Sequence, residues 1–424
     1  MFGSDLMFLR IQEMLEGAKV SARTIVMFNA MRYRNYRLYW LGQLSSVLAQ
    51  GMELVAQGWL ILQLTDSPFM LGLTGLAHAI PTIVLTLVGG VIADRIDRRR
   101  IMILAQGTTA CVFFGLATLI VTGLVQVWHI MLFAFLSGSL KAFDRPSRYA
   151  LLPHMVSTEE LASAVAMGSA IWQLSRLIGP GIAGTLIYVF GVGTTFYVCC
   201  LGSLTAVVFW LMIRMERLPS SNTNRGLLHH MADGLNFIKS NEIFYTLIGM
   251  TFFNSIFGLS YVILMPVFAR DILQVGSQGF GFLQTTTGAG SLLGVLIVAS
   301  LARSSRKGWQ VIMGAVIFGI SLIGFAFSPW YLLSLGLVFF IGLANQVYMT
   351  TIISILQLKV PDQLRGRVMS IFGLTWDLTP VGGTIAGTIA EFAGAPVAVA
   401  ISCFMVMAMA SMVAVYLPRV RQME

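Results

Sequence analysis

The sequence predicts an all-α membrane protein in which twelve transmembrane helices form two parallel six-helix repeats. Composition is the first reason, since the 424 residues are 57% hydrophobic and only 11% charged, whereas soluble domains carry roughly 25% charged residues. Spacing is the second, because apolar stretches near the roughly 20 residues that cross a bilayer recur along the whole chain. The third is that a stretch of the first half recurs in the second half.

Helices rather than strands are expected to cross the bilayer. A spanning segment has to satisfy its backbone polar groups internally, and a helix does so by itself. A β-barrel would need short segments of alternating polarity, which this sequence does not contain. The twelve predicted spans are 38–64, 68–92, 101–123, 127–146, 161–189, 193–214, 241–268, 277–301, 309–328, 331–356, 366–391 and 395–417.

The positive charges predict the orientation of these spans. With both termini in the cytoplasm, all of the 27 basic residues except Arg176 and Arg270 fall on the cytoplasmic side, as the positive-inside rule requires. This arrangement puts Lys141, Arg145 and Arg148 at the loop after the fourth span. Because the net charge of +9 is spread over a whole membrane face, it does not indicate a nucleic-acid partner.

The spans divide the chain into five parts. Residues 1–37 combine helical apolar spacing with basic and aromatic residues, which predicts an amphipathic helix on the inner leaflet or, alternatively, a frayed tail. A first bundle (38–214), a cytoplasmic middle loop (215–240), a second bundle (241–417) and a cytoplasmic tail (418–424) follow. The four cysteines lie in apolar runs, which favours packed thiols over disulfides or metal ligands.

An internal repeat predicts how the two bundles are related. The stretch LASAVAMGSAIWQLSRLIGPGIAGTLIYVFG (161–191) aligns without gaps with LRGRVMSIFGLTWDLTPVGGTIAGTIAEFAG (364–394), so the fifth span repeats as the eleventh. The two six-span halves therefore share one orientation. Parallel halves joined by a charged middle loop are one of the architectures that carry solutes by alternating access.

The stretch GGVIADRIDRRR (89–100) carries a family resemblance. It resembles the signature that the major facilitator superfamily has between its second and third spans, with Asp97 where the signature has its second glycine. That aspartate, together with NYRLYWLGQLSSVLAQG, AFDRPSRYALLPHMV and PDQLRGRVMSIFG, resembles the branch containing macrolide and enterobactin-type siderophore exporters. The resemblance covers nearly the whole chain and implies a secondary transporter with the same twelve-helix fold.

The resemblance implies a latch on the cytoplasmic side. Gly90 would let two helices approach closely, and Asp94 would face the start of the eleventh span, where the helix dipole and arginines attract its charge. Such a latch would hold that side shut in one state of the transporter. The alternative for the arginines is a simple topology anchor. The predicted latch consists of Gly90, Asp94, Arg95, Arg98, Arg99, Arg365 and Arg367.

A second signature bears on the direction of transport. In LIGPGIAG of the fifth span, Gly179, Pro180 and Gly184 resemble the glycine-proline motif of antiporters in this superfamily, although Ala183 replaces one expected glycine. Proline bends a helix, and glycines give it a smooth face for close packing. The resemblance implies export by antiport, and ordinary helix packing is the alternative.

Ionisable and amide side chains inside the spans are the candidates for transport itself, because charges there are costly. The resemblance implies a cavity lined by the first, fourth, seventh and tenth spans. Gln50, Glu53 and Gln57 share one face of the first span. Glu53 would exchange a proton for a cationic substrate, or would be paired permanently with Arg176.

Further candidates lie on other spans. Asp377 would pair with His78 or Arg176, or carry the proton itself, although a lone histidine such as His78 more often has a structural role. Lys141 and Asp144 are expected to be gate or interface charges at the cytoplasmic end of the fourth span and not substrate ligands. The candidate hydrogen-bonding residues of the cavity are Asn254, Asn345, Gln346 and Tyr348.

These features predict a secondary transporter and not an enzyme. The sequence contains neither a nucleotide-binding loop nor a catalytic or metal constellation, so an ion gradient is the expected energy source and no cofactor is expected. The prediction is a monomeric exporter in a bacterial inner membrane, surrounded by lipid, that exchanges H⁺ or Na⁺ for an amphipathic or cationic small molecule such as a drug or siderophore. The alternatives are an importer or facilitator, a lipid transporter, and a non-transporting receptor or scaffold.

Overall fold

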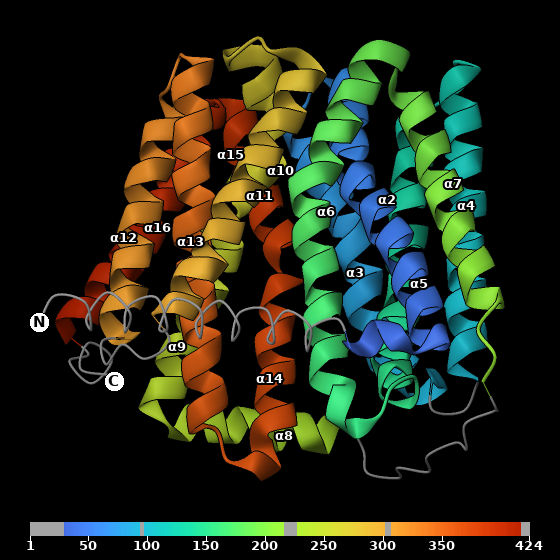
Figure 1. Ribbon diagram of the computed structural model, residues 1–424. Coiled ribbons are helices and arrows are strands. Elements are labelled where there is room, and N and C mark those ends of the chain that lie inside the picture. Colours follow the sequence, from blue (N-terminus) through green and yellow to red (C-terminus); the bar gives the residue numbers. More distant parts are fainter. Residues whose placement is uncertain (1–28, 94–96, 216–226, 302–306, 417–424) are drawn as a thin grey trace, which may run out of the picture.

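The computed structural model describes residues 29–93, 97–215, 227–301 and 307–416 (Figure 1). Most of the predicted arm and the whole tail lie outside these ranges. The described residues form helices and no strand, which confirms the all-α prediction. The first half contains η1 (Asn29–Arg32), α2 (Arg34–Thr65), α3 (Pro68–Ala93), α4 (Arg98–Val121), α5 (Val127–Leu151), η2 (Leu152–His154), η3 (Thr158–Glu160), α6 (Leu161–Phe190) and α7 (Val192–Leu211).

The second half has the same overall plan with more interruptions. Its seventh and eleventh predicted spans are each built from more than one helical segment. The second half contains α8 (Leu227–Ser240), α9 (Glu242–Phe253), η4 (Asn254–Gly258), α10 (Ser260–Val267), η5 (Phe268–Ile272), α11 (Gly276–Ser300), α12 (Lys307–Ala326), α13 (Tyr331–Lys359), α14 (Asp362–Trp376), α15 (Thr379–Ala393) and α16 (Ala395–Tyr416).

Ten helical segments among the described residues are long and apolar enough to cross a membrane. The two remaining predicted spans correspond to α5 and to the pair α14 and α15. Charged residues in its second half lower the hydropathy of α5, and a break after Trp376 divides the eleventh span into two helices of 15 residues each. The chain is a multi-pass membrane protein, and a count of twelve spans stays a prediction.

The fourth span is longer than predicted. Because α5 continues to Leu151, Arg148 lies inside this helix and not in the loop after it. Lys141 and Arg145 lie in the same helix, within the predicted span 127–146. Hydropathy alone ended the predicted span at residue 146, since charges are costly in a membrane. In the structure each of these three side chains has an acidic partner, which offsets that cost.

The helices have two distinguishable ends. We call the end with the brief connections around Asp66, Gly191 and Gly394 the short-loop end, and the opposite end, which carries α8, the charged end. In Figure 1 the short-loop end is at the top, and α8 lies across the bottom beside α14. Helix α8 falls within the stretch 215–240 that was predicted as a middle loop.

The two halves contact each other mainly toward the short-loop end. Helix α6 packs on α11, α15 packs on α3, and α10 packs on both α2 and α3. Helix α14, the part of the eleventh span nearer the charged end, packs on α8, α9 and α13 of its own half. The halves are therefore joined at one end of the molecule.

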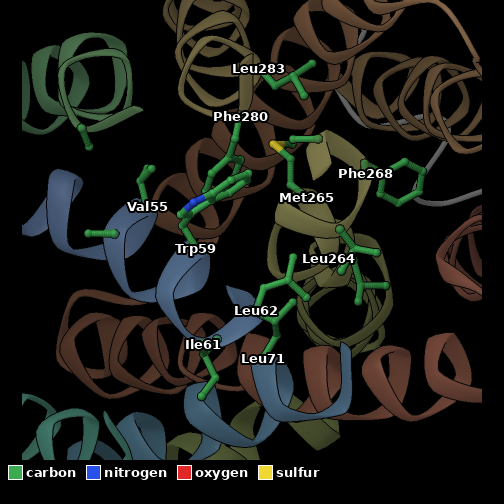
Figure 2. Close-up of a cluster of buried hydrophobic side chains, with 14 of the residues drawn as sticks. Val55, Trp59, Ile61, Leu62, Leu71, Leu264, Met265, Phe268, Phe280 and Leu283 are labelled. Atoms are coloured by element: carbon green, nitrogen blue, oxygen red, sulfur yellow. The ribbon is translucent and has the colours of Figure 1, made fainter. Parts of the chain in front are cut away.

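Apolar side chains from both halves seal this junction (Figure 2). The ring of Trp59 on α2 stacks on Phe280 of α11, with 6.2 Å between ring centroids. Leu62 of α2 and Leu264 and Met265 of α10 belong to the same buried cluster. A continuous apolar layer thus separates the interior of the protein from the short-loop end.

Candidate transport site

Glu53 is the deepest acid of the first half, and its charge is fully engaged. Its side chain on α2 is only 3% exposed. Ser137 Oγ donates to Glu53 Oε1 (2.7 Å), and Lys141 Nζ lies 3.3 Å from Oε2, both from α5. A buried carboxylate needs such partners because an unpaired charge in this environment is costly. Uptake of a proton by Glu53 would abolish this ion pair.

The predicted pairing of Glu53 with Arg176 is wrong, since Lys141 occupies that role. Lys141 is thus half of a buried ion pair within the first half, and its role as a gate or interface charge stays a prediction. His78 of α3 lies close enough to Lys141 to interact electrostatically with it. Its Nε2 is buried and has no hydrogen-bond partner among the described residues.

Asp377 makes an ion pair between the two halves. It lies at the break between α14 and α15, and Arg145 Nη1 of α5 is 3.9 Å from its Oδ1. The expected pairing of Asp377 with His78 or Arg176 is therefore wrong. The break has a local cause, because Pro380 at the start of α15 has no backbone N–H to donate to the preceding turn.

Gln50 and Gln57 lie on α2 one turn to either side of Glu53 but do not hydrogen-bond to it. Gln50 Nε2 donates to Ser46 Oγ (3.3 Å). Gln57 Nε2 is buried, and the described residues offer it no acceptor. One of the two amides is thus available to bind a polar group.

In the second half, Asn254 and Asn345 come together across two spans. Asn345 Nδ2 of α13 donates to Asn254 Oδ1 (3.4 Å). Asn254 begins the π-helix η4, a rare form of helix that is frequent at functional sites. By contrast, Gln346 donates to Thr350 on its own helix (2.9 Å), and Tyr348 is buried. The sequence pattern contains no signal for the π-helix.

A second buried ion pair was not predicted. Arg148 Nη2 lies 2.6 Å from Asp144 Oδ2 and donates to Ser46 Oγ (3.0 Å), and its guanidinium lies 4.7 Å from the ring centre of Trp210. The i, i+4 spacing of Asp144 and Arg148 on one helix was the available signal. Arg148 thus links α5 to α2 and α7, and Asp144 neutralises it from the same helix; the role of Asp144 as a gate or interface charge stays a prediction.

Arg176 differs from these basic residues. It lies near the middle of α6, and its side chain is exposed. Among the residues that the structure describes, none forms an ion pair with it, and the ionisable residue close enough to affect its charge is Tyr261 of α10.

The predicted cytoplasmic latch is only partly within the described residues. Asp94 and Arg95 lie outside them, and the surroundings of Gly90 are not described. Arg365 pairs with Asp362 of its own helix (2.6 Å), and Arg367 lies on the same helix. The contact of Asp94 with α14 therefore stays a prediction.

Arg98 and Arg99 contact their own half of the molecule. Arg99 donates to the carbonyl oxygens of Trp210 (3.0 Å) and Leu211 (2.8 Å) at the end of α7. Arg98 Nη1 donates to Ala150 O near the end of α5 (3.1 Å). Cations are favourable at the C-terminal ends of helices. These contacts fit the anchor alternative and explain why arginines stand here.

Asp97, which replaces a glycine of the family signature, has a local role. Its carboxylate accepts a hydrogen bond from the backbone N–H of Arg99 (3.0 Å) and caps the start of α4. Aspartate is one of the favoured residues at this position. The departure from the signature thus has a physical reason.

The glycine-proline stretch lies where α6 meets two other helices. Gly179 faces Gly51 of α2 within the same half, whereas Gly184 faces Gly281 of α11 in the other half. A Cβ at Gly184 would be 2.8 Å from Gly281 Cα. Glycine at residue 184 is therefore required by the contact between halves.

At the short-loop end, two charged residues of the second half bind the helix ends on either side of the turn between α2 and α3. Arg270 binds the end of α2, and Glu391 binds the start of α3. Arg270 Nη1 donates to Leu62 O (2.9 Å) at the end of α2 and to Asp66 Oδ1 (2.6 Å). Glu391 Oε2 accepts from Ser67 Oγ (2.7 Å) and the backbone N–H of Phe69 (3.2 Å) at the start of α3. A cation meets a C-terminus and an anion meets an N-terminus, as helix dipoles favour. This contact explains why Arg270 is an exception to the positive-inside pattern.

Comparison with known proteins places this geometry in a family. A family model described as "Transmembrane secretion effector" matches residues 25–424. The staphyloferrin A transporter of Staphylococcus aureus is 26% identical over 361 residues, covering 84% of this chain and 86% of the relative. The multidrug efflux pump Tap of Mycolicibacterium fortuitum is 25% identical and covers 90% and 95% of the two chains. The enterobactin exporter EntS of Shigella flexneri is 24% identical and covers 83% of each.

Solved structures share the fold. The nucleoside transporter NupG superposes with a TM-score of 0.70 at 13% identity, covering 90% of this chain and 99% of that one. A bacterial homologue of the human lysosomal transporter Spinster, in an inward-facing and unoccupied conformation, gives 0.69 at 15% identity and covers 95% and 97%. The chain therefore belongs to the transmembrane secretion effector family, in the macrolide and siderophore exporter branch of the major facilitator superfamily, and is a membrane transporter and not an enzyme.

Proposed function

We propose that this transporter is a proton-coupled exporter of an amphipathic small molecule. The charged end faces the cytoplasm, with both termini on that side, and the short-loop end faces outward. The substrate enters between the halves from the charged end and leaves after the halves rock about their junction. The named exporters and efflux pumps among the relatives support this direction of transport.

The buried ion pair between Glu53 and Lys141 carries the proposal. Glu53 is the acid whose protonation would change the structure most, because it is 3% exposed and joins α2 to α5. Neutralising it would leave Lys141 without its partner and loosen this contact. A proton taken up from outside would then shift the equilibrium between the two states of the transporter.

Asp377 is the second acid that a proton would affect. Its ion pair with Arg145 joins the two halves, and both side chains are accessible, at 26% and 61% exposure. Protonation of Asp377 would remove an attraction between the halves. The two acids would therefore act on different contacts, Glu53 within the first half and Asp377 between the halves.

Efflux from pump-deficient bacteria tests the coupling. Cells expressing the protein are loaded with ethidium or with fluorescein, and efflux is followed with and without a protonophore. We expect the wild type to export at least one dye in a protonophore-sensitive way, and Glu53→Gln to lose that component because its side chain cannot be charged.

The matched control is Glu159→Gln, which removes the same charge from an exposed position at the charged end. It should export like the wild type. Unchanged protonophore-sensitive efflux by both Glu53→Gln and Asp377→Asn would rule out these acids as the site of coupling.

A further inference from the structure

Arg176 is a cation in the middle of the membrane that lacks a counter-charge within the described protein. About 20 Å of helix separates it from each end of α6. Four other basic residues of the described spans have acidic partners within 4 Å, namely Lys141 with Glu53, Arg145 with Asp377, Arg148 with Asp144, and Arg270 with Asp66 and Asp271. These pairs also engage the acids Glu53, Asp144 and Asp377. Among these five basic residues, Arg176 is the one without an acidic partner within 4 Å.

The backbone of Arg176 lies where α6 meets both its own half and the second half. The next residue, Ser175, faces α2, where its hydroxyl donates to Val47 O (2.7 Å). On the α11 side, a Cβ at Gly288 would lie 2.8 Å from the carbonyl carbon of Arg176, so the α6 backbone touches the second half here. The side chain itself interacts electrostatically with Tyr261 of α10, a helix of the second half that also packs on α2.

Two other spans of the described protein, one in each half, hold further donors without acceptors. Gln57 Nε2 on α2 and Asn254 Nδ2 on η4 are buried, and no described residue accepts a hydrogen bond from either. Buried donors are normally satisfied, and an unpaired charge inside a membrane protein marks a functional site. Gln57 and Asn254 each lack a hydrogen-bond acceptor, and Arg176 lacks an anionic partner among the described residues.

We propose that Arg176 binds a carboxylate or another oxyanion group of the exported molecule, so that the substrate is an amphipathic acid. This inference rests on the proposed export function and specifies its substrate class. It reverses the cationic substrate expected from Glu53, since that acid already neutralises Lys141. The planar guanidinium donates two parallel hydrogen bonds to an oxyanion, which gives both affinity and orientation. Tyr261 and the Gln57 amide would border the bound group.

Three ring-matched probes test the charge preference. Full-length protein in lipid nanodiscs is dialysed against 1-naphthoate, 1-naphthylmethylammonium or 1-naphthalenemethanol, and binding to empty nanodiscs is subtracted. We expect the wild type to bind naphthoate at least about tenfold more tightly than either other probe, as a charge-assisted pair provides. Arg176→Gln should lose this preference, and Arg176→Lys should keep part of it because the charge remains while the fork is lost.

Arg214→Gln is the control, because it removes an exposed arginine at the charged end that belongs neither to the proposed site nor to the predicted latch. It should bind naphthoate like the wild type. Naphthoate binding that survives in Arg176→Gln, or a wild type that binds naphthoate no better than the other probes, would overturn the proposal. Retained folding is checked by thermal unfolding of each variant.

This binding assay needs no ion gradient, so it separates the two proposals. If naphthoate binds through Arg176 but dye efflux is insensitive to protonophore, the proton-coupled mechanism fails and the anion site stands. If efflux depends on Glu53 while Arg176→Gln leaves binding unchanged, the anion site fails and the coupling stands.

Discussion

At the scale of single residues, two of the ion pairs inside this transporter join different spans. Glu53 and Lys141 hold α2 to α5, whereas Arg145 and Asp377 connect the halves. The first pair is buried and the second is partly accessible. Breaking a buried pair by removing one partner costs more than the pair itself contributes, because the remaining charge is stranded.

We therefore expect Lys141→Met to destabilise the protein by about 3 kcal/mol, since the Glu53 carboxylate would be left without its cation. The double variant Glu53→Gln/Lys141→Met should recover much of that loss, because no charge is then stranded. Unfolding in detergent, followed for the wild type, both single variants and the double variant, gives the coupling energy. Strictly additive losses would show that the two side chains do not interact.

At the scale of elements, the turn between α2 and α3 is held from two sides by the second half. Arg270 binds the end of α2, and Glu391 binds the start of α3. Glu391 is exposed to solvent, and the Asp66 side chain is 80% exposed, so each contact is weak. Weak contacts that match the helix ends suit a closure that has to open in every transport cycle.

We expect Glu391→Gln to raise the ratio of externally open to externally closed molecules about fivefold, because the loss of one helix cap shifts a two-state equilibrium by about this factor. Spin labels at Leu124 and Leu332, exposed side chains of the two halves at this end, report the opening as a longer distance. The labels are introduced after replacing the four native cysteines.

Asp271→Asn is the matched control for this closure, because Asp271 pairs with Arg270 inside the same half. This substitution removes an acid at the short-loop end but leaves intact the contacts that Glu391 makes with the first half. A distance distribution that shifts as much in Asp271→Asn as in Glu391→Gln would contradict the role assigned to Glu391.

At the scale of the whole molecule, the backbones of α6 and α11 bring the two halves into direct contact. Gly184 of α6 and Gly281 of α11 meet at this contact, and small residues allow membrane helices to approach closely. The contact is tight near the short-loop end, so this end is sealed in the observed state. The glycine-proline stretch of α6 therefore contributes directly to the junction about which the halves would move.

Gly184→Leu should force α6 and α11 apart, because the new side chain would overlap Gly281 and overpacking is costly. We expect at least about tenfold slower efflux in the dye assay, together with a longer distance between the spin labels. Gly168→Leu is the control on the same helix, since a Cβ there meets nothing within 4 Å. Equal effects of the two substitutions would mean that the contact between halves is not the cause.

The sequence predicted more of the helices than of the site. The helical character of the chain and the family resemblance can be read from local patterns, and the described residues and the comparisons agree with them. Glu53, Asp377 and Arg176 were also identified as candidates, because a charge in an apolar run is visible in the sequence. Their partners were assigned incorrectly. Lys141 lies 88 residues from Glu53 along the chain, and no local pattern connects them.

The sequence by itself determined the membrane location and the order of the helices, because span length and hydropathy are properties of each segment alone. The tertiary structure decided which charges are neutralised, since ion pairs form between spans that are distant in sequence. It alone extended α5 beyond its charged residues, because partners on α2 and at the α14–α15 break satisfy Lys141 and Arg145. It also left Arg176 without an acid among the described residues. A counter-charge is a matter of distance in space, and only packing of the helices sets that distance.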